Sequence, residues 1–388
     1  MRRFFLIASL LAFVAVGAVA QELTVGVDLS TTGEMAAIGI PQKNGFMIVA
    51  PPTIAGLKVK YVYYDDASDP TIAVQNVKRM ISEDHIDVLI GPTFTSTSLA
   101  VQEALMDGKV PGFAFGQTVS IVTPVDAKRR WVFKTVPNDI TFVNAVVNHM
   151  LTKTKVRTLG IIAVSDGFGE TWINVTQQVA VPKGIKIVGI ERYGRADNSC
   201  TPQVLRIMKY NPDAILIAAS STAAVTPHLG LIERGYKGKI YQSGGSVNPD
   251  FLRLGGKAVE GSFNEQSPFV VAEQLPDGYP FKKGAVDFLK QYEAKYGAGS
   301  RASYAAYGGD SIRLIAAAVP TALKKGKPGT FQFREALRDA LENSKNVVGL
   351  SAVFTMSPTD HTGINELGMC VLRVENGKWK LEQSAAFE

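Results

Sequence analysis

The stretch of sequence that decides the fold runs from Val88 to Thr118 and reads VLIGPTFTSTSLAVQEALMDGKVPGFAFGQT. An apolar run, Val88–Ile90, leads through a hydroxyl-rich turn into a helix-like run over Ser98–Met106. A second apolar run, Val110–Phe115, ends in the small polar turn Gly116–Thr118. This order predicts two neighbouring parallel strands of an α/β sheet. Both turns then lie beyond the carboxyl ends of the strands, where such sheets bind their ligands.

Three adjacent hydroxyl side chains, Thr95, Ser96 and Thr97, stand at the start of the helix-like run. The first N–H groups of a helix have no partner inside it, and the helix dipole favours a negative group beside them. Hydroxyls at the same place can donate further hydrogen bonds. We therefore predict a cradle for a small anion, most simply a carboxylate. The alternative is that these residues only cap the helix.

Strands and helices alternate along most of the chain, which predicts an α/β protein built from βαβ units. Asp69-Pro70 marks the start of a helix, and Asn376-Gly377 between two alternating runs marks a hairpin. The pattern restarts near Arg157, and small polar residues again follow apolar runs at Ser220–Thr222 and Ser243–Ser246. Two α/β halves with polar rims predict two lobes that face each other across a cleft.

The first twenty residues differ from the rest of the chain. Arg2-Arg3 precede an almost wholly apolar run, Phe4–Val19, which ends in a small-x-small site at Ala20. This pattern predicts a secretory signal peptide over residues 1–20. No later stretch is apolar for long enough to span a bilayer. We therefore expect a soluble protein of the periplasm.

Composition and charge exclude several classes of partner. The chain has 388 residues, a formal net charge of +6 and 46% hydrophobic residues, which is typical of a globular protein of about two domains. Its lysines and arginines are scattered, and the short basic runs Lys128–Arg130 and Lys324–Lys327 fall in predicted loops. Such runs are typical of solvated faces, so we expect no nucleic-acid partner.

The residues that would support catalysis or metal binding are missing from the sequence. Four histidines stand at no metal-ligand spacing, and there is no G-x-S-x-G, P-loop or complete dinucleotide motif. We therefore predict no metal, no cofactor and no enzymatic activity. The two cysteines, Cys200 and Cys370, would either pair in an exported protein or remain as two buried thiols.

Several short motifs, in this order and spacing, resemble the periplasmic solute-binding proteins of the branched-chain amino acid (Leu/Ile/Val-binding) ABC transporter family. The motifs are Val25–Asp28 with Thr32-Gly33, Tyr64–Pro70, Ile90–Pro92 with Thr95-Ser96, Val110-Pro111 with Gly116–Thr118, and Asp166–Gly169. The resemblance covers the whole chain after residue 20. It implies an extracytoplasmic component of an importer, a monomer that delivers a small ligand to an inner-membrane ABC permease.

The family's fold consists of two doubly wound parallel-sheet lobes, joined by a three-crossover hinge, that close on a ligand in the cleft between them. The resemblance places the crossovers near Thr135–Pro137, Asn264–Pro268 and Val347–Leu350. The first lobe would then comprise residues 21–135 and 268–347, and the second lobe residues 136–267 and 348–388. The family's disulfide is not expected, because Ser68 and Phe94 occupy its positions.

The resemblance also assigns ligand-binding roles. It implies that a carboxylate binds to the first lobe, and that Phe168 and Ile38 cover the apolar part of the ligand. Ile38 departs from the aromatic residue usual in the family. Polar residues of the second lobe would meet any polar tail. The predicted ligand-binding residues are Ile38, Thr95, Ser96, Gly116, Gln117, Thr118, Phe168, Ser220, Ser243 and Ser246, with Gln242 beside them.

One departure from the family bears on the class of ligand. Amino-acid binders hold the ligand ammonium with an acidic residue after a second-lobe strand, whereas Tyr241–Asn248 contains no Asp or Glu. A buried ammonium without a carboxylate partner is costly. We therefore expect a carboxylic acid that lacks an α-amino group, such as an aromatic acid. Two alternatives stay open: an amino-acid binder that uses Asp166, and a ligand-sensing receptor of the same fold.

Overall fold

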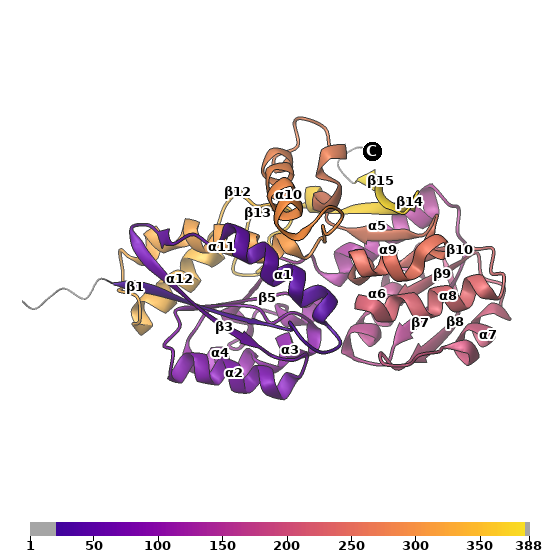
Figure 1. Ribbon diagram of the computed structural model, residues 1–388. Helices are drawn as coiled ribbons and strands as arrows, with labels where there is room; N and C mark the ends of the chain where they lie inside the picture. Colours follow the sequence, from indigo (N-terminus) through magenta and orange to yellow (C-terminus); the bar gives the residue numbers. More distant parts are fainter. Residues whose placement is uncertain (1–20, 385–388) are drawn as a thin grey trace, which may run out of the picture.

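The computed structural model describes residues 21–384, which form two α/β lobes side by side (Figure 1). The predicted signal peptide falls outside these residues. The first lobe is built on a six-stranded sheet with the order β2-β3-β1-β4-β5-β6. Its strands are β1 (Glu22–Leu29), β2 (Thr53–Ile54), β3 (Leu57–Asp65), β4 (Val88–Ile90), β5 (Gly112–Ala114) and β6 (Val132–Lys134).

Helices from two distant parts of the chain cover this sheet. Figure 1 shows α11 and α12, from the last third of the sequence, beside α1 and β1 from its beginning. Helix α11 packs against both α1 and α12. The helices are α1 (Ala36–Val49), α2 (Pro70–Ser82), α3 (Thr95–Ala100), α4 (Gln102–Gly108), α10 (Lys282–Tyr296), α11 (Ala305–Ala322) and α12 (Phe331–Glu342).

The second lobe is built on a seven-stranded sheet with the order β15-β14-β11-β10-β9-β7-β8. Two central strands, β7 and β9, are almost entirely buried apolar runs, which is typical of a parallel sheet covered on both faces. The strands are β7 (Thr158–Val164), β8 (Lys186–Tyr193), β9 (Ala214–Ala218), β10 (Lys239–Gln242), β11 (Phe263–Gln266), β14 (Cys370–Glu375) and β15 (Lys378–Ser384). The helices are α5 (Asp139–Thr152), α6 (Gly167–Ala180), α7 (Thr201–Met208), α8 (Val225–Glu233) and α9 (Pro249–Gly255).

The predicted α/β class and two-lobe architecture are confirmed, but both sheets are mixed rather than purely parallel. Strand β2 runs antiparallel to β3, and β14 runs antiparallel to β11 and β15. Tight hairpins explain the β2–β3 and β14–β15 pairs, whereas β11 and β14 pair across a long connection. Asn376 and Gly377 both have positive φ (54° and 68°), as the predicted two-residue turn requires, and Ala55-Gly56 joins β2 to β3 in the same way. The chain passes between the two sheets after β6, after β11 and before β14; a short ribbon of β12 (Val347–Val348) and β13 (Val353–Phe354) lies in the last connection.

Two local predictions have different outcomes. The Asp69 side chain accepts hydrogen bonds from the N–H groups of Thr71 (2.6 Å) and Ile72 (3.1 Å), which confirms it as the cap of α2. The single helix predicted over Ser98–Met106 is wrong, because α3 and α4 are separated at Val101. Helix α3 begins at Thr95, after an extended Phe94, so the three hydroxyls lie inside its first turn rather than before it.

Candidate functional site

A cavity of about 390 Å³, including space open to solvent, lies between the lobes. Its walls are mainly apolar and aromatic, with a few polar side chains, as is usual for small-molecule sites. The first lobe and its crossover contribute Met35, Ile38, Thr93, Phe94, Thr95, Phe115, Gly116, Gln117, Val136 and Tyr304; the second lobe contributes Phe168, Arg195, Ser220 and Gly245. Six of the ten predicted ligand-binding residues therefore line one cavity: Ile38, Thr95, Gly116, Gln117, Phe168 and Ser220.

The first-lobe wall carries a hydroxyl group that has no protein partner. Thr95 is only 2% exposed, and its Oγ1 makes no hydrogen bond with any residue between 21 and 384. The neighbouring Thr97 hydroxyl donates to the carbonyl of Phe94 (3.2 Å), as a helix-capping residue does. Burying an unpaired hydroxyl costs free energy, and a hydrogen bond to a ligand would remove that cost. Thr95 therefore carries a buried hydroxyl on the cavity wall that is free to bind a ligand.

The turn at Gly116 lies directly against the start of α3. A Cβ atom at Gly116 would come within 2.8 Å of the Thr95 Cα and 2.9 Å of its N. Only glycine permits this approach. The Gly116 N–H donates to the Ser98 hydroxyl (3.3 Å), and the neighbouring Gln117 side chain leaves its Oε1 without a partner among the described residues. The two turns predicted from Val88–Thr118 thus form one continuous wall.

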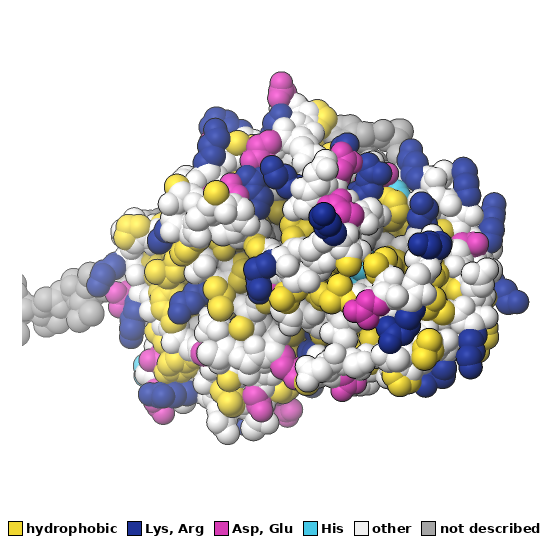
Figure 2. Space-filling view, turned by 45° about the vertical axis from the view of Figure 1, so that its right-hand side comes forward, with side chains coloured by type: hydrophobic (Ala, Val, Ile, Leu, Met, Phe, Trp, Pro, Cys, Tyr) yellow, Lys and Arg dark blue, Asp and Glu magenta, His cyan; other side chains and the backbone are white. Residues whose placement is uncertain are grey.

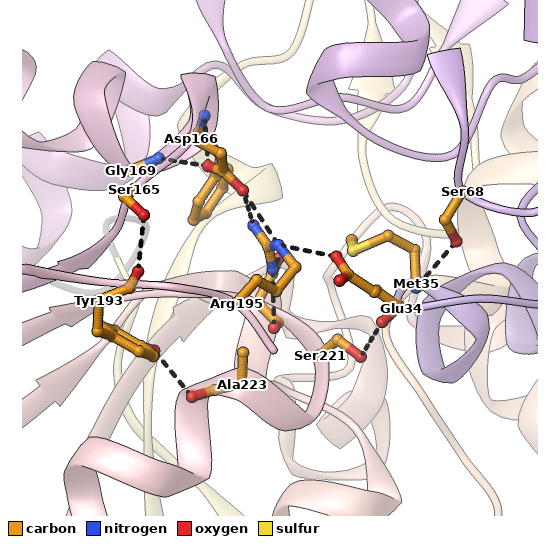
Figure 3. A network of polar contacts seen from close by, with 12 residues as sticks. Glu34, Met35, Ser68, Ser165, Asp166, Gly169, Tyr193, Arg195, Ser221 and Ala223 are labelled. Carbon is orange, nitrogen blue, oxygen red and sulfur yellow. Dashed lines mark hydrogen bonds and ion pairs between the residues drawn. The ribbon is translucent and has the colours of Figure 1, made fainter. Parts of the chain in front are cut away.

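The second-lobe wall carries a cation that the sequence analysis missed. The Arg195 side chain is 9% exposed and lies between Asp166 of its own lobe and Glu34 of the first lobe (Figure 3). Its Nη1 donates to Oγ (2.9 Å) and O (3.2 Å) of Ser220. Gly245 makes room here, because a Cβ atom on it would lie 2.2 Å from the Ser220 Cβ. A signal existed in the sequence: Arg195 comes two residues after β8, at the sheet edge that carries the site.

Asp166 orients this arginine and begins α6. Its Oδ1 accepts hydrogen bonds from the N–H groups of Phe168 (2.9 Å) and Gly169 (3.1 Å). Its Oδ2 accepts from Nε (3.0 Å) and Nη2 (2.5 Å) of Arg195. A carboxylate has about four lone-pair sites for hydrogen bonds. Asp166 therefore already accepts as many hydrogen bonds as a carboxylate usually can, all from its own lobe. It is also not among the residues that line the cavity.

The lobes touch around the cavity, so the structure is that of a closed cleft. The Ser221 hydroxyl donates to the Glu34 carbonyl (3.0 Å), and the Glu34 carboxylate lies 4.0 Å from the Arg195 Nε (Figure 3). The Thr118 hydroxyl, from the first lobe, donates to the Thr171 hydroxyl on α6 (3.3 Å). These contacts join the two lobes directly and would break if the cleft opened.

The remaining predicted residues lie outside the cavity wall. The hydroxyls of Ser243 and Ser246 donate to the carbonyls of Ala219 and Ser243, respectively. The Gln242 amide lies against a ring nitrogen of His228 (3.0 Å). Ser96 and Thr118 also do not line the cavity, and Thr118 makes the contact between the lobes instead. The sequence pattern could not show which hydroxyls are already paired inside the lobe.

Other predicted features have simple outcomes. Cys200 and Cys370 are both free and buried, so the alternative of two unpaired thiols holds. Ser68, at one position of the family's disulfide, uses its hydroxyl to donate to the Thr32 carbonyl (2.8 Å). Between residues 21 and 384, no three His, Cys, Asp or Glu side chains gather as metal ligands would. In the same range no helix combines the length and apolar character needed to cross a membrane.

Comparison with known proteins identifies the family. Residues 22–378 match the family model described as periplasmic binding protein. An extracellular ligand-binding receptor from Rhodopseudomonas palustris HaA2 is 36% identical, with a TM-score of 0.89 over 93% of this chain and 100% of the other. This identity and coverage, together with the family model, are sufficient to place the chain in that family.

Two more distant structures share the fold. A solute-binding protein of an ABC transporter from R. palustris, solved with 4-hydroxybenzoate, is 19% identical (TM-score 0.79, 94% of this chain and 96% of the other). A branched-chain amino acid transporter substrate-binding protein from Streptococcus pneumoniae, solved with isoleucine, is 16% identical (TM-score 0.79, 93% and 98%). Membership of a family of binding proteins agrees with the prediction that the chain is not an enzyme. The chain belongs to the periplasmic binding protein family and is a solute-binding protein of the ABC-transporter type.

Proposed function

We propose that this protein captures a small apolar carboxylic acid without an α-amino group, most simply an aromatic acid, and delivers it to an ABC permease in the inner membrane. The observation that carries the proposal is the unpaired Thr95 hydroxyl on the wall of a largely apolar cavity. The carboxylate would dock on Thr95 and the turn at Gly116. Met35, Ile38 and Phe168 would cover the apolar body of the ligand.

The far end of the ligand would meet the second lobe. Arg195 and Ser220 line the cavity there, opposite the first-lobe turns. The guanidinium has five N–H donors, and its hydrogen bonds to Asp166 and Ser220 use four of them. The Asp166 carboxylate also neutralises the charge of the guanidinium. A neutral oxygen on the ligand, such as a phenol hydroxyl, therefore suits this wall better than a second carboxylate. The relative solved with 4-hydroxybenzoate carries a ligand of this chemistry.

The amino-acid alternative fits the cavity less well. Among residues 21–384, no Asp or Glu lines it. Asp166 already accepts four hydrogen bonds within its own lobe. Glu265, behind Gly244, is fully buried and does not line the cavity, and burial raises the pKa of its carboxyl group well above the usual range. A ligand ammonium would therefore lack an anionic partner, which makes its burial costly.

The test is a thermal-shift screen on refolded, ligand-free protein. The panel contains benzoate, 4-hydroxybenzoate, 4-coumarate and short aliphatic acids, with leucine, valine and phenylalanine as the amino-acid set. A ligand at about 100 times its Kd adds roughly 2.7 kcal/mol to the free energy of unfolding, which raises the Tm by several degrees. A shift with aromatic acids alone supports the proposal. A shift with leucine or valine, or with none of the acids, contradicts it.

A further inference from the structure

A fully buried lysine lies behind the first-lobe turn that faces the cavity. Lys134 is the last residue of β6, where the chain leaves the first sheet, and its side chain is 0% exposed. Its Nζ donates to the carbonyls of Gln117 (2.8 Å) and Thr118 (3.2 Å) and to the Asn138 Oδ1 (2.7 Å). An ammonium group has three donors. All three are used, and two of them hold the turn.

These bonds fix the direction of the peptide between Gln117 and Thr118. The Gln117 carbonyl also accepts from the N–H of Asp139 (3.1 Å), and the Val119 N–H donates to the Asp139 Oδ1 (3.2 Å). The turn is therefore clamped between Lys134 and Asp139. In a planar trans peptide, the N–H points away from the carbonyl. The Thr118 N–H thus points away from Lys134, and it has no hydrogen-bond partner in the described part of the chain.

The same lysine connects the turn to two segments that pass between the lobes. Its side-chain partner Asn138 directly precedes α5 and donates through Nδ2 to the Thr362 hydroxyl (3.1 Å). The backbone N–H of Lys134 donates to the His361 carbonyl (2.9 Å). A movement of either segment during closure would therefore act on the turn through Lys134.

The charge of Lys134 suits an anion on the other side of the turn. Burial lowers the pKa of its ammonium group to about 7, while Asp139 on α5 and Asp360 beside His361 oppose the shift. An anionic ligand nearby would favour the charged form further. Keeping a cation here costs desolvation energy that a buried apolar residue would avoid.

We propose that Lys134 is a positioning residue for ligand capture: its ammonium group holds the Gln117–Thr118 peptide and so fixes the cavity-lining turn at Gly116 and Gln117, on which the anionic group of the ligand would dock, and it ties this turn to the crossing segments. This inference rests on the proposed function. Lys134 touches the binding turn and not the ligand, so its effect is on affinity through the geometry and the charge of the turn.

The first test compares two buried substitutions. Lys134→Met keeps the length of the side chain but removes the charge and the donors. The control, Tyr241→Phe, removes hydrogen bonds of the Tyr241 hydroxyl with His149 (2.9 Å) and Thr154 (2.7 Å), away from the cavity. By calorimetry with 4-hydroxybenzoate, we expect Lys134→Met to raise the Kd about tenfold or more. Tyr241→Phe should lower the Tm and leave the Kd unchanged. Equal Kd values for the two variants would overturn the inference.

The second test uses the wild-type protein, so it does not depend on the folding of Lys134→Met. Titration of 4-hydroxybenzoate in buffers of different ionisation enthalpy measures the protons taken up on binding. We expect uptake at and just above pH 7, because the bound anion raises the proton affinity of Lys134. No uptake would contradict the placement of the ammonium group beside the anion. If the wild type binds 4-hydroxybenzoate but either test fails, this inference alone falls; if it binds none of the acids, the proposed function falls as well.

Discussion

Arg195 and Asp166 form a two-point ion pair at the edge of the cavity, with the Asp166 Oδ2 accepting from both Nε (3.0 Å) and Nη2 (2.5 Å) of Arg195. The other Asp166 oxygen caps α6. One carboxylate therefore fixes both the helix that carries Phe168 and the cation that lines the second-lobe wall. This pairing holds the Arg195 guanidinium rigid and balances its charge. Both effects restrict the ligand groups that the guanidinium can bind.

The Thr95 hydroxyl should matter for affinity and not for folding. Thr95→Val removes a buried hydroxyl that has no partner in the described chain, so the Tm of the ligand-free protein should stay the same or rise. The Kd for an aromatic acid should rise about 10- to 100-fold, since a hydrogen bond to a charged group contributes roughly 1.5–3 kcal/mol. Calorimetry and thermal melts measure the two effects.

The matched control is Thr97→Val in the same helical turn. The Thr97 hydroxyl donates to the Phe94 carbonyl and does not line the cavity. This variant should lose a little stability and keep the wild-type Kd. If both valine variants weaken binding equally, Thr95 has no special role at the carboxylate.

Arg195 should discriminate between acids that do and do not carry a polar group at the far end. Arg195→Met should raise the Kd for 4-hydroxybenzoate about tenfold more than the Kd for benzoate, because one hydrogen bond to a charged donor is lost only with the first ligand. Parallel calorimetric titrations of both acids measure the ratio. An equal rise in Kd for both acids would instead mean that Arg195 binds the carboxylate itself.

The contact between Ser221 and Glu34 should stabilise the closed form. Ser221→Ala removes a hydrogen bond of 3.0 Å between the lobes, which contributes about 1 kcal/mol, so the Kd should rise about fivefold. Ser165→Ala is the control, since the Ser165 hydroxyl bonds to the Tyr193 carbonyl within the second lobe. Small-angle scattering with and without ligand would report closure. A compact ligand-free Ser221→Ala protein with unchanged Kd would contradict the prediction.

Asp28 should make the stability depend on pH. Burial and then the neighbouring Asp66 raise the pKa of Asp28 to about 8, well above its usual 3.8. As the pH rises from 3.8 to 8, the unfolded chain releases this proton while the folded chain keeps it, so the wild type loses stability. Asp28→Asn cannot titrate. Its Tm relative to the wild type should therefore be higher at pH 8 than at about pH 5.

The exposed Asp107→Asn variant provides the baseline for this comparison. The change in Tm of Asp28→Asn with pH is read relative to this variant. A difference for Asp28→Asn that stays constant with pH would show that Asp28 is ionised in the folded protein.

The local signals in the sequence were sufficient for much of the fold. The order of elements around Val88–Thr118, the Asp69 cap and the Asn376-Gly377 turn all appear in the structure. They could be predicted because hydrophobic periodicity, caps and tight turns depend on residues close together in the chain. The antiparallel pairing of β14 with β11 and the break at Val101 were missed, because pairing partners and helix ends are set by distant contacts.

The sequence by itself determined the α/β alternation, the family motifs and the two turns that follow β4 and β5. Only the tertiary structure decided which polar groups at those turns are free. The Thr95 hydroxyl has no partner in the described chain, whereas the Ser243 hydroxyl donates to the Ala219 carbonyl. Tertiary structure also brought Arg195 to the cavity and Lys134 behind the turn at Gly116 and Gln117. The reason is physical. The type of a residue sets which hydrogen bonds its side chain can make, but the partners in those bonds come from segments far away in the chain.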